Sequence, residues 1–163
     1  MYTWVDYLTV DELDSCMHVR KMCACNQLRR ATRGITALYE AAMAPSGVKV
    51  TQLPILVGLG SEGDLSVTTL ADALALDRTT LTRNLKVLQE RGLIRITEDA
   101  ADARVRMVSL TLEGSRVLAV ALMRWEEIQS MVEEHFGRDR LRALYEELSA
   151  LGDALSAETR SPA

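Results

Sequence analysis

The chain has 163 residues, of which 48% are hydrophobic and 26% are charged. This composition is typical of one globular domain and excludes a disordered chain. No apolar run reaches the roughly 18 residues that a membrane span requires, and residues 1–15 carry acids but no base, which excludes a secretory signal or a transit peptide. We therefore expect a single domain over residues 1–163 that is soluble and cytoplasmic, with no membrane partner.

Charge is distributed unevenly along the chain. The net charge of −4 argues, as an average, against a nucleic-acid partner. Residues 126–158 hold nine acids and three bases, however, whereas residues 77–106 hold seven bases and five acids. The acidity is thus concentrated towards the C-terminal end, and the central segment can present a basic face.

The first half of the chain predicts helices. A long helical pattern runs from a possible N-cap at Ser15 to Met43, and the breaker sequence 45–47 ends it. Thr51 then caps a shorter helix, in which Pro54 falls within the first turn, where a missing N–H is tolerated.

Two helices separated by a short turn follow. Ser66 caps the first, which ends near residues 75–76, and Asp77 caps the second, over residues 78–91. About three residues join them. The second helix has a buried stripe of Leu81, Leu85 and Leu88.

The pattern then changes to β. Strands are predicted over residues 93–97 and 105–110, joined by a polar hairpin tip at 98–104. Thr111 caps a helix of about 25 residues, and a last helix covers residues 138–155. Five leucines of this last helix follow a heptad spacing: Leu141, Leu144, Leu148, Leu151 and Leu155.

Two helices joined by a short turn and followed by a β-hairpin are the element order of a winged helix-turn-helix. The fold class expected is therefore mainly α with a small β-hairpin wing. Residues 51–111 form the winged lobe, and residues 15–50 and 112–158 form dimerisation helices at the two ends of the chain.

The second helix of this motif has the outer face that a major groove requires. Arginine can bridge a guanine edge, threonine offers a methyl group and a hydroxyl, and a helix N-terminus favours phosphate. No acid lies between Asp77 and Glu90. Double-stranded DNA is the expected partner, and the alternative is a winged-helix protein-interaction module. The candidate DNA-binding residues of the two helices are Ser66, Arg78, Thr79, Thr80, Thr82, Arg83 and Lys86.

At these residues the sequence resembles the MarR (multiple-antibiotic-resistance regulator) family of bacterial transcription factors, over nearly the whole chain. The matching segments are residues 70–71, 81–83 and 88–94, then Asp99, Asp102 and Arg104 in the hairpin, and Leu110, Thr111 and Gly114 after it. Members of this family are homodimers that bind pseudo-palindromic operators, usually as repressors released by a small ligand or by oxidation.

The resemblance also implies residue roles. Thr82 and Arg83 would read the major groove, and Arg104 would reach from the wing into the minor groove. Asp102 would orient Arg104, and Asp99 would support the wing. The sequence departs from the family pattern at Asn84, where the family usually has an apolar residue, and in the alanines of the wing, where a second base is often found.

Dimerisation is also expected on physical grounds. The helices at the two ends carry apolar stripes too long to bury inside a small winged lobe, and one subunit reads only one half-site. We expect the heptad leucines to lie between subunits. The alternative is that they pack on the long helix of their own chain.

Three cysteines lie within residues 16–25, too close together to staple the fold. Cys16, His18, Cys23 and Cys25 are possible metal ligands, but on one helix Cys23 and Cys25 point about 200° apart, so one ion could collect all four only if the stretch is not helical. No metal site is predicted.

Two other roles for these thiols remain open. In the hydroperoxide-sensing branch of the family a reactive cysteine stands fourteen residues before a tyrosine, and Cys25 and Tyr39 have that spacing. Arg29, one turn after Cys25, could favour the thiolate. The other possibility is that the cysteines are only small residues packed in a dimer helix.

No residue pattern supports catalysis. The two histidines have no catalytic partner near them in sequence, and no glycine-rich phosphate loop is present. We expect a non-enzymatic protein without a cofactor. A small-molecule effector is possible, with Tyr39, Arg29 and Trp125 as candidate pocket residues.

Overall fold

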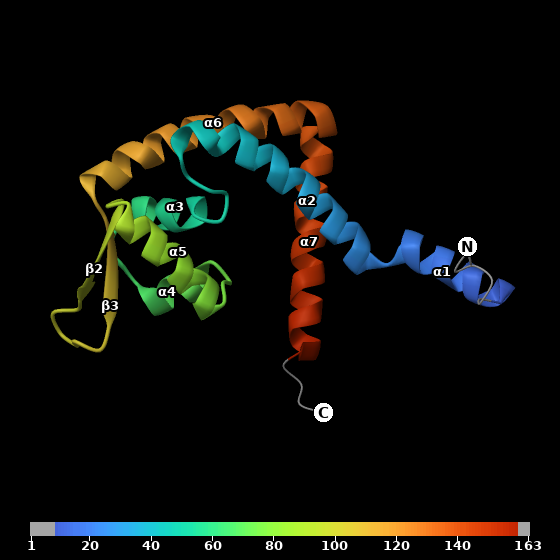
Figure 1. Ribbon diagram of the computed structural model, residues 1–163, viewed down its shortest axis with the longest axis horizontal. Helices are drawn as coiled ribbons and strands as arrows, with labels where there is room; N and C mark the ends of the chain where they lie inside the picture. Colours follow the sequence, from blue (N-terminus) through green and yellow to red (C-terminus); the bar gives the residue numbers. More distant parts are fainter. Residues whose placement is uncertain (1–8, 160–163) are drawn as a thin grey trace, which may run out of the picture. The chain divides into compact units, whose positions relative to one another are not determined.

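The computed structural model describes residues 9–159 and is mostly helical (Figure 1). It divides into two compact units, with the boundary between Ala41 and Ala42. The first contains α1 and most of α2, and the second contains everything from the end of α2 onwards.

The first unit consists of two helices rather than one. The single helix predicted from Ser15 to Met43 is wrong: α1 covers Val10–Met22 and α2 covers Ala24–Met43. The chain begins its helix earlier than expected because Thr9 and Glu12 form a capping box. Cys23 has an extended backbone and separates the helices.

The break at Cys23 is stabilised by a side chain from the next turn. Gln27 Nε2 donates to the carbonyl of Lys21 at 2.7 Å, which supplies a donor to one of the carbonyls left unpaired where α1 ends. The Gln27 N–H then donates to the carbonyl of Cys23 at 3.1 Å and begins the hydrogen bonding of α2.

In the second unit, the end of α2 is followed by a short 3-10 helix, η2, at Ala44–Ser46, and then by α3 at Leu53–Glu62. Pro54 lies in the first turn of α3, as predicted. The predicted cap at Thr51 is wrong. Gln52 is the N-cap and makes no side-chain cap bond, whereas the Thr51 hydroxyl is turned to Asn84.

Two short helices and a sheet complete the winged lobe. The helices are α4 at Val67–Ala73, capped by Ser66, and α5 at Arg78–Glu90, capped by Asp77, and both caps are as predicted. The strands are β1 at Leu65–Ser66, β2 at Ile94–Glu98 and β3 at Arg106–Leu110.

The sheet has one strand more than the sequence predicted. Its order is β1-β3-β2, and both pairings are antiparallel. β1 is only two residues long and pairs through Leu65 with Val108, so its length is too short for a periodic pattern to show. The predicted hairpin of β2 and β3 is present, with Ile96 opposite Val108 and Glu98 opposite Arg106.

The core of this unit is built from aliphatic side chains. The largest fully buried ones are Met43, Val48, Ile55, Leu56, Leu70, Leu81, Leu88 and Val108. They come from α2, the segment before α3, each helix of the lobe and β3, so α5 is held on the lobe by its inner face.

Two long helices follow the sheet. Thr111 caps α6, Leu112–Phe136, whose 25 residues agree with the prediction. Gly137, in the left-handed region at φ 94°, ends α6 and leads into α7, Arg138–Thr159. Figure 1 shows α6 running from the sheet to a turn from which α7 leaves in a different direction. Among the described residues, no helix is both long and apolar enough to span a membrane.

Candidate nucleic-acid interface

Helix α5 is fixed by its cap and by its inner face. Leu81, Leu85 and Leu88 are buried. Asp77 Oδ1 accepts the Thr80 N–H at 2.9 Å, and hydrogen bonds from the side chain and then the backbone of Thr80 hold the pKa of Asp77 below its ordinary value. The Asp77 carboxylate therefore satisfies one of the free N–H groups at the N-terminus of α5. The outer face of the helix takes no part in this cap and stays exposed to solvent.

The outer face of α5 forms a shallow depression lined only by arginine, threonine and lysine. The lining residues are Arg78, Thr79, Thr82, Arg83 and Lys86. Five of the sequence-predicted residues are thus brought together on one surface. The Thr82 hydroxyl donates to the carbonyl of Arg78 at 2.7 Å, so its remaining contributions to a ligand are the methyl group and an oxygen lone pair.

Two predicted residues of the same helices do not line this depression. Ser66 acts as the N-cap of α4, since its hydroxyl oxygen accepts the Thr69 N–H at 3.0 Å. Thr80 is half-buried, with its N–H on Asp77 and its carbonyl accepting from Asn84 Nδ2 at 3.0 Å. Both residues shape the two helices rather than the exposed surface of α5.

Polar contacts join α5 to the segment that precedes α3. Asn84, where the resembling family usually has an apolar residue, is half-buried and accepts from the Thr51 hydroxyl at 3.4 Å. At the end of α5, Arg91 Nη1 donates to the carbonyl of Gly47 at 2.6 Å. These two hydrogen bonds hold the helix from the side opposite its exposed face.

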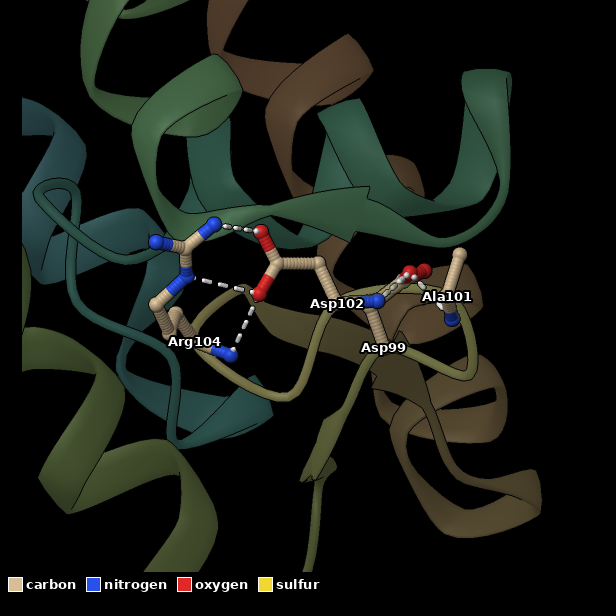
Figure 2. Close-up of polar contacts among 4 residues, drawn as sticks. All are labelled: Asp99, Ala101, Asp102 and Arg104. Carbon is tan, nitrogen blue, oxygen red and sulfur yellow. Dashed lines mark hydrogen bonds and ion pairs between the residues drawn. The ribbon is translucent and has the colours of Figure 1, made fainter.

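The tip of the wing is an ordered polar loop (Figure 2). Asp99 Oδ1 accepts the N–H groups of Ala101 and Asp102, at 2.9 and 3.1 Å. Asp102 in turn holds Arg104 with two parallel bonds, Nε to Oδ1 at 3.0 Å and Nη2 to Oδ2 at 2.9 Å. This fork fixes the direction of an arginine side chain that is 91% exposed.

The same pair shifts both pKa values. The hydrogen bond from the Arg104 side chain, followed by that from its backbone N–H, lowers the pKa of Asp102, and the carboxylate raises the pKa of Arg104. Because the folded protein favours the carboxylate form of Asp102, the contribution of this pair to the stability of the fold is fully present above the ordinary pKa of an aspartate. It is lost only as the pH falls through the lowered value.

Sequence reasoning overlooked Arg106 and Gln89. They lie with Lys86 and Thr82 along a groove between α5 and the hairpin. Arg106 is the first residue of β3, only two residues after Arg104 of the wing tip, but its place beside α5 depends on how the hairpin folds against that helix. The alternation of β3 would have placed Arg106 on the same face as the buried Val108.

The heptad leucines divide into two groups. Leu144, Leu148, Leu151 and Leu155 are exposed, at 38 to 56%. Leu141 is 7% exposed within the single chain, as expected for the alternative in which a heptad leucine packs on the long helix of its own chain. It lies in the first turn of α7, where this helix packs against α6 and Ile128 is also buried.

The cysteine region is helical on both sides of Cys23, so the condition for gathering all four candidate metal ligands is not met. Within residues 9–159 no group of three or more histidine, cysteine or acidic side chains could hold a metal ion. Cys16 and Cys25 are exposed and Cys23 is half-buried. Cys25 and Tyr39 both lie on α2, about 21 Å apart along the axis.

A short helix, a turn, a capped second helix with a basic outer face, and an antiparallel wing define a winged helix-turn-helix protein of the transcription-regulator class. Comparison with known proteins agrees. The model of the MarR family matches residues 46–105. Transcriptional regulator HosA of Escherichia coli O127:H6 is 34% identical over 115 residues, which are 71% of this chain and 82% of that protein. The chain belongs to the MarR family of transcriptional regulators.

Solved structures give the same result. The chain is similar to the Mycobacterium tuberculosis transcriptional regulator MosR in complex with DNA, with 34% identity and a TM-score of 0.76, covering 85% of this chain and 99% of that one. The fold is also that of the PcaV regulator of Streptomyces coelicolor in complex with its natural ligand. For PcaV the identity is 22% and the TM-score 0.77, covering 83% of this chain and 96% of that one. These relatives are regulators and not enzymes.

Proposed function

We propose that this protein binds a pseudo-palindromic operator as a homodimer and acts as a repressor. The observation that carries the proposal is the surface of α5. Its exposed depression is lined by two arginines, a lysine and two threonines, and no carboxylate lies on α5 before Glu90. In a chain with a net charge of −4 this face is suited to the major groove.

The proposed roles follow from position. Thr82 and Arg83 contact base edges, while Arg78, Thr79 and Lys86 contact the backbone beside them. Arg104, held out by Asp102, enters the adjacent minor groove, where an arginine reads width and potential more than sequence. Ser66 and Thr80 act indirectly, by capping and shaping α4 and α5.

Exposed apolar stripes support a dimer. Leu28, Ile35 and Leu38 of α2 are 37 to 43% exposed. Four leucines of α7 are exposed as well, namely Leu144, Leu148, Leu151 and Leu155. Leucine stripes of this length are seldom left in water, and a second copy of the chain would cover them by symmetry.

The relatives support the same proposal. The matched MosR structure holds DNA, and at 34% identity over nearly its whole length its partner is a reasonable guide to that of the present chain. The competing proposal, a protein-interaction module, has no observation of its own in favour.

A salt titration separates the two. The purified chain is mixed with a labelled genomic duplex over about 50 to 200 mM salt, and both Kd and stoichiometry are measured. A dimer contacting several phosphates should lose affinity steeply, by about three orders of magnitude or more for six to ten contacts, and should bind as two chains per site. An interaction module would show no salt-dependent binding to any duplex.

Release from DNA is proposed to be geometric. A dimer presents two copies of α5 to major grooves about 34 Å apart. A signal that changes the angle between the two lobes breaks this match and lowers the affinity without unfolding the protein. The signal is either a small molecule, with Tyr39, Arg29 and Trp125 as candidate contacts, or oxidation of a thiol.

The thiol route is proposed to use Cys25. This side chain is exposed near the start of α2, with Arg29 one turn further along the same helix. Tyr39 lies about four turns from Cys25 on the same helix, too far for the two side chains of one chain to meet. A contact between them therefore requires Tyr39 to come from the partner subunit of a dimer.

Hydrogen peroxide should therefore release DNA from the native protein but not from a Cys25→Ser variant, as measured by fluorescence anisotropy. Cys16→Ser, which alters an exposed thiol of α1, is the matched control and should respond like the native protein. Equal release from the Cys25→Ser variant would remove Cys25 from the mechanism.

A further inference from the structure

A second groove borders the DNA-facing depression on α5. It lies between α5 and the β-hairpin, with Val67, Leu85 and Ile96 as its apolar part and Lys86, Gln89 and Arg106 as its polar part. Thr82 and Lys86 line both hollows. The groove is therefore continuous with the surface proposed to contact DNA.

The strand register places Arg106 on the groove side of the hairpin. Arg106 is opposite Glu98, and Val108 is opposite Ile96. Since side chains alternate along a strand, Ile96 and Glu98 share one face of β2, and Arg95 lies on the other. The two strands of the hairpin thus carry two exposed arginines, Arg106 on one face and Arg95 on the other.

Both cations of the groove already have a carboxylate partner. Arg106 Nη1 lies 3.0 Å from Glu98 Oε1, and Lys86 Nζ lies 3.8 Å from Glu90 Oε1. All four side chains are more than half exposed. Solvated ion pairs of this kind are weak and exchange readily, so a phosphate oxygen can replace either carboxylate.

The kind of ligand that this groove would bind follows from its position between α5 and the wing. If α5 enters a major groove and Arg104 the adjacent minor groove, the sugar-phosphate backbone that separates these grooves has to cross the surface between them. The basic groove is the surface that lies there. This step rests on the proposed function, because it takes the docking of α5 and the wing as given.

We propose that Lys86 and Arg106 form a seat for this phosphate backbone, and that Glu98 competes with the phosphate for Arg106. The contact is independent of sequence and fixes the register of the wing relative to α5. Glu98 lowers the affinity for any duplex, because its charge must be displaced from Arg106 before the phosphate can bind.

The test compares Arg106→Gln with Arg95→Gln, two variants with the same charge change on opposite faces of one hairpin. Binding of the full chain to an operator fragment and to a mixed-sequence duplex is measured against salt. Each lost phosphate contact reduces the slope of log K against log salt by about 0.9, so a dimer with Arg106→Gln should lose about 1.8. Its affinity should fall by the same factor on both duplexes, and Arg95→Gln should leave the slope unchanged.

Glu98→Gln should have the opposite effect on duplex affinity to Arg106→Gln. It should tighten binding to both duplexes in the native background, and this gain should disappear when combined with Arg106→Gln. A gain that persists in the double variant would mean that Glu98 acts only through the overall charge, and would overturn the competition.

Two further outcomes would count against the seat and can be distinguished. Equal slope changes for the Arg106 and Arg95 variants would overturn the seat while leaving the proposed function standing. Absence of salt-dependent duplex binding by the native chain would overturn both. Thermal unfolding of each variant verifies that the exposed substitutions leave the fold intact.

Discussion

Arg83→Ala is expected to weaken operator binding by about 1 to 3 kcal/mol per half-site, and therefore by more in a dimer that loses both contacts. Arg83 lines the exposed depression of α5 together with Arg78 and Thr82. A guanidinium in this position can donate two hydrogen bonds to a guanine edge, and truncation removes both. Anisotropy titrations against the operator and against single-base variants should show one base preference relaxed.

Two other variants separate the charge of Arg83 from its geometry. Arg83→Lys keeps the positive charge but not the bidentate fork, so it should relax the same base preference while the salt slope stays close to native. Arg116→Ala, which removes an exposed arginine paired with Glu113 on α6, is the control and should bind normally. An unchanged affinity for Arg83→Ala would contradict the placement of α5 in the major groove.

Gly114→Ala is expected to destabilise the fold by about 3 kcal/mol, at the upper end of overpacking effects. A Cβ on Gly114 would lie 1.9 Å from the carbonyl oxygen of Leu93, which is backbone and cannot rotate away. That carbonyl accepts the Thr111 N–H at 3.1 Å. The first turn of α6 is thus packed directly on the chain leading from α5 into β2, and one methyl group would force the two apart.

Denaturant unfolding followed by circular dichroism measures this effect. Gly34→Ala is the matched control: Gly34 lies within α2, and a Cβ there would meet nothing within 4 Å. The control should be neutral or more stable, by up to about 1 kcal/mol, because alanine is the better helix former. If Gly114→Ala were as stable as the control, the close contact between α6 and Leu93 would be wrong.

Elements with strong local signals could be predicted from the sequence. The caps at Ser66, Asp77 and Thr111, the leucine stripe of α5 and the β-hairpin are all where the sequence placed them. Each depends on interactions within a few residues, such as the bond from the Thr80 N–H to Asp77, or on a periodicity that any amphipathic element shows.

The errors have a different origin. The helix breaks at Cys23, whose backbone is extended, although no proline or glycine stands there to mark the break in the sequence. The hydrogen bond from Gln27 that stabilises the break is equally invisible in the sequence pattern. Thr51 has the chemistry of a cap, but its hydroxyl bonds to Asn84, 33 residues further along the chain. Each of these depends on a partner distant in sequence or on an unmarked break.

The candidate site was only half predictable for the same reason. The outer face of α5 follows from helical periodicity, so five of its residues could be named in advance. Arg106 and Gln89 join the candidate interface only because the hairpin folds against α5, where both residues line one groove. Alternation along the strands separates Arg106, on the face of the buried Val108, from Arg95, on the face opposite the buried Ile94, but the sequence does not show that α5 borders the first of these faces.

A basic surface in an acidic protein has a functional consequence. The nine acids of residues 126–158 lie on α6 and α7, whereas the exposed face of α5 carries none before Glu90. The average charge discourages non-specific adsorption to DNA, and the local surface still attracts phosphate. With α5 docked as proposed, binding to specific sites would depend on the base contacts of α5 more than on bulk electrostatic attraction.

Selection of bound fragments from a random-sequence duplex pool tests the pairing of two α5 helices on DNA most directly. Sequencing of the retained fragments should reveal an inverted repeat whose half-site centres are about 10 base pairs apart, with a conserved guanine in each half where Arg83 docks. Retention of fragments without any shared repeat, or of a single unrepeated half-site, would contradict a symmetric dimer that reads DNA through α5.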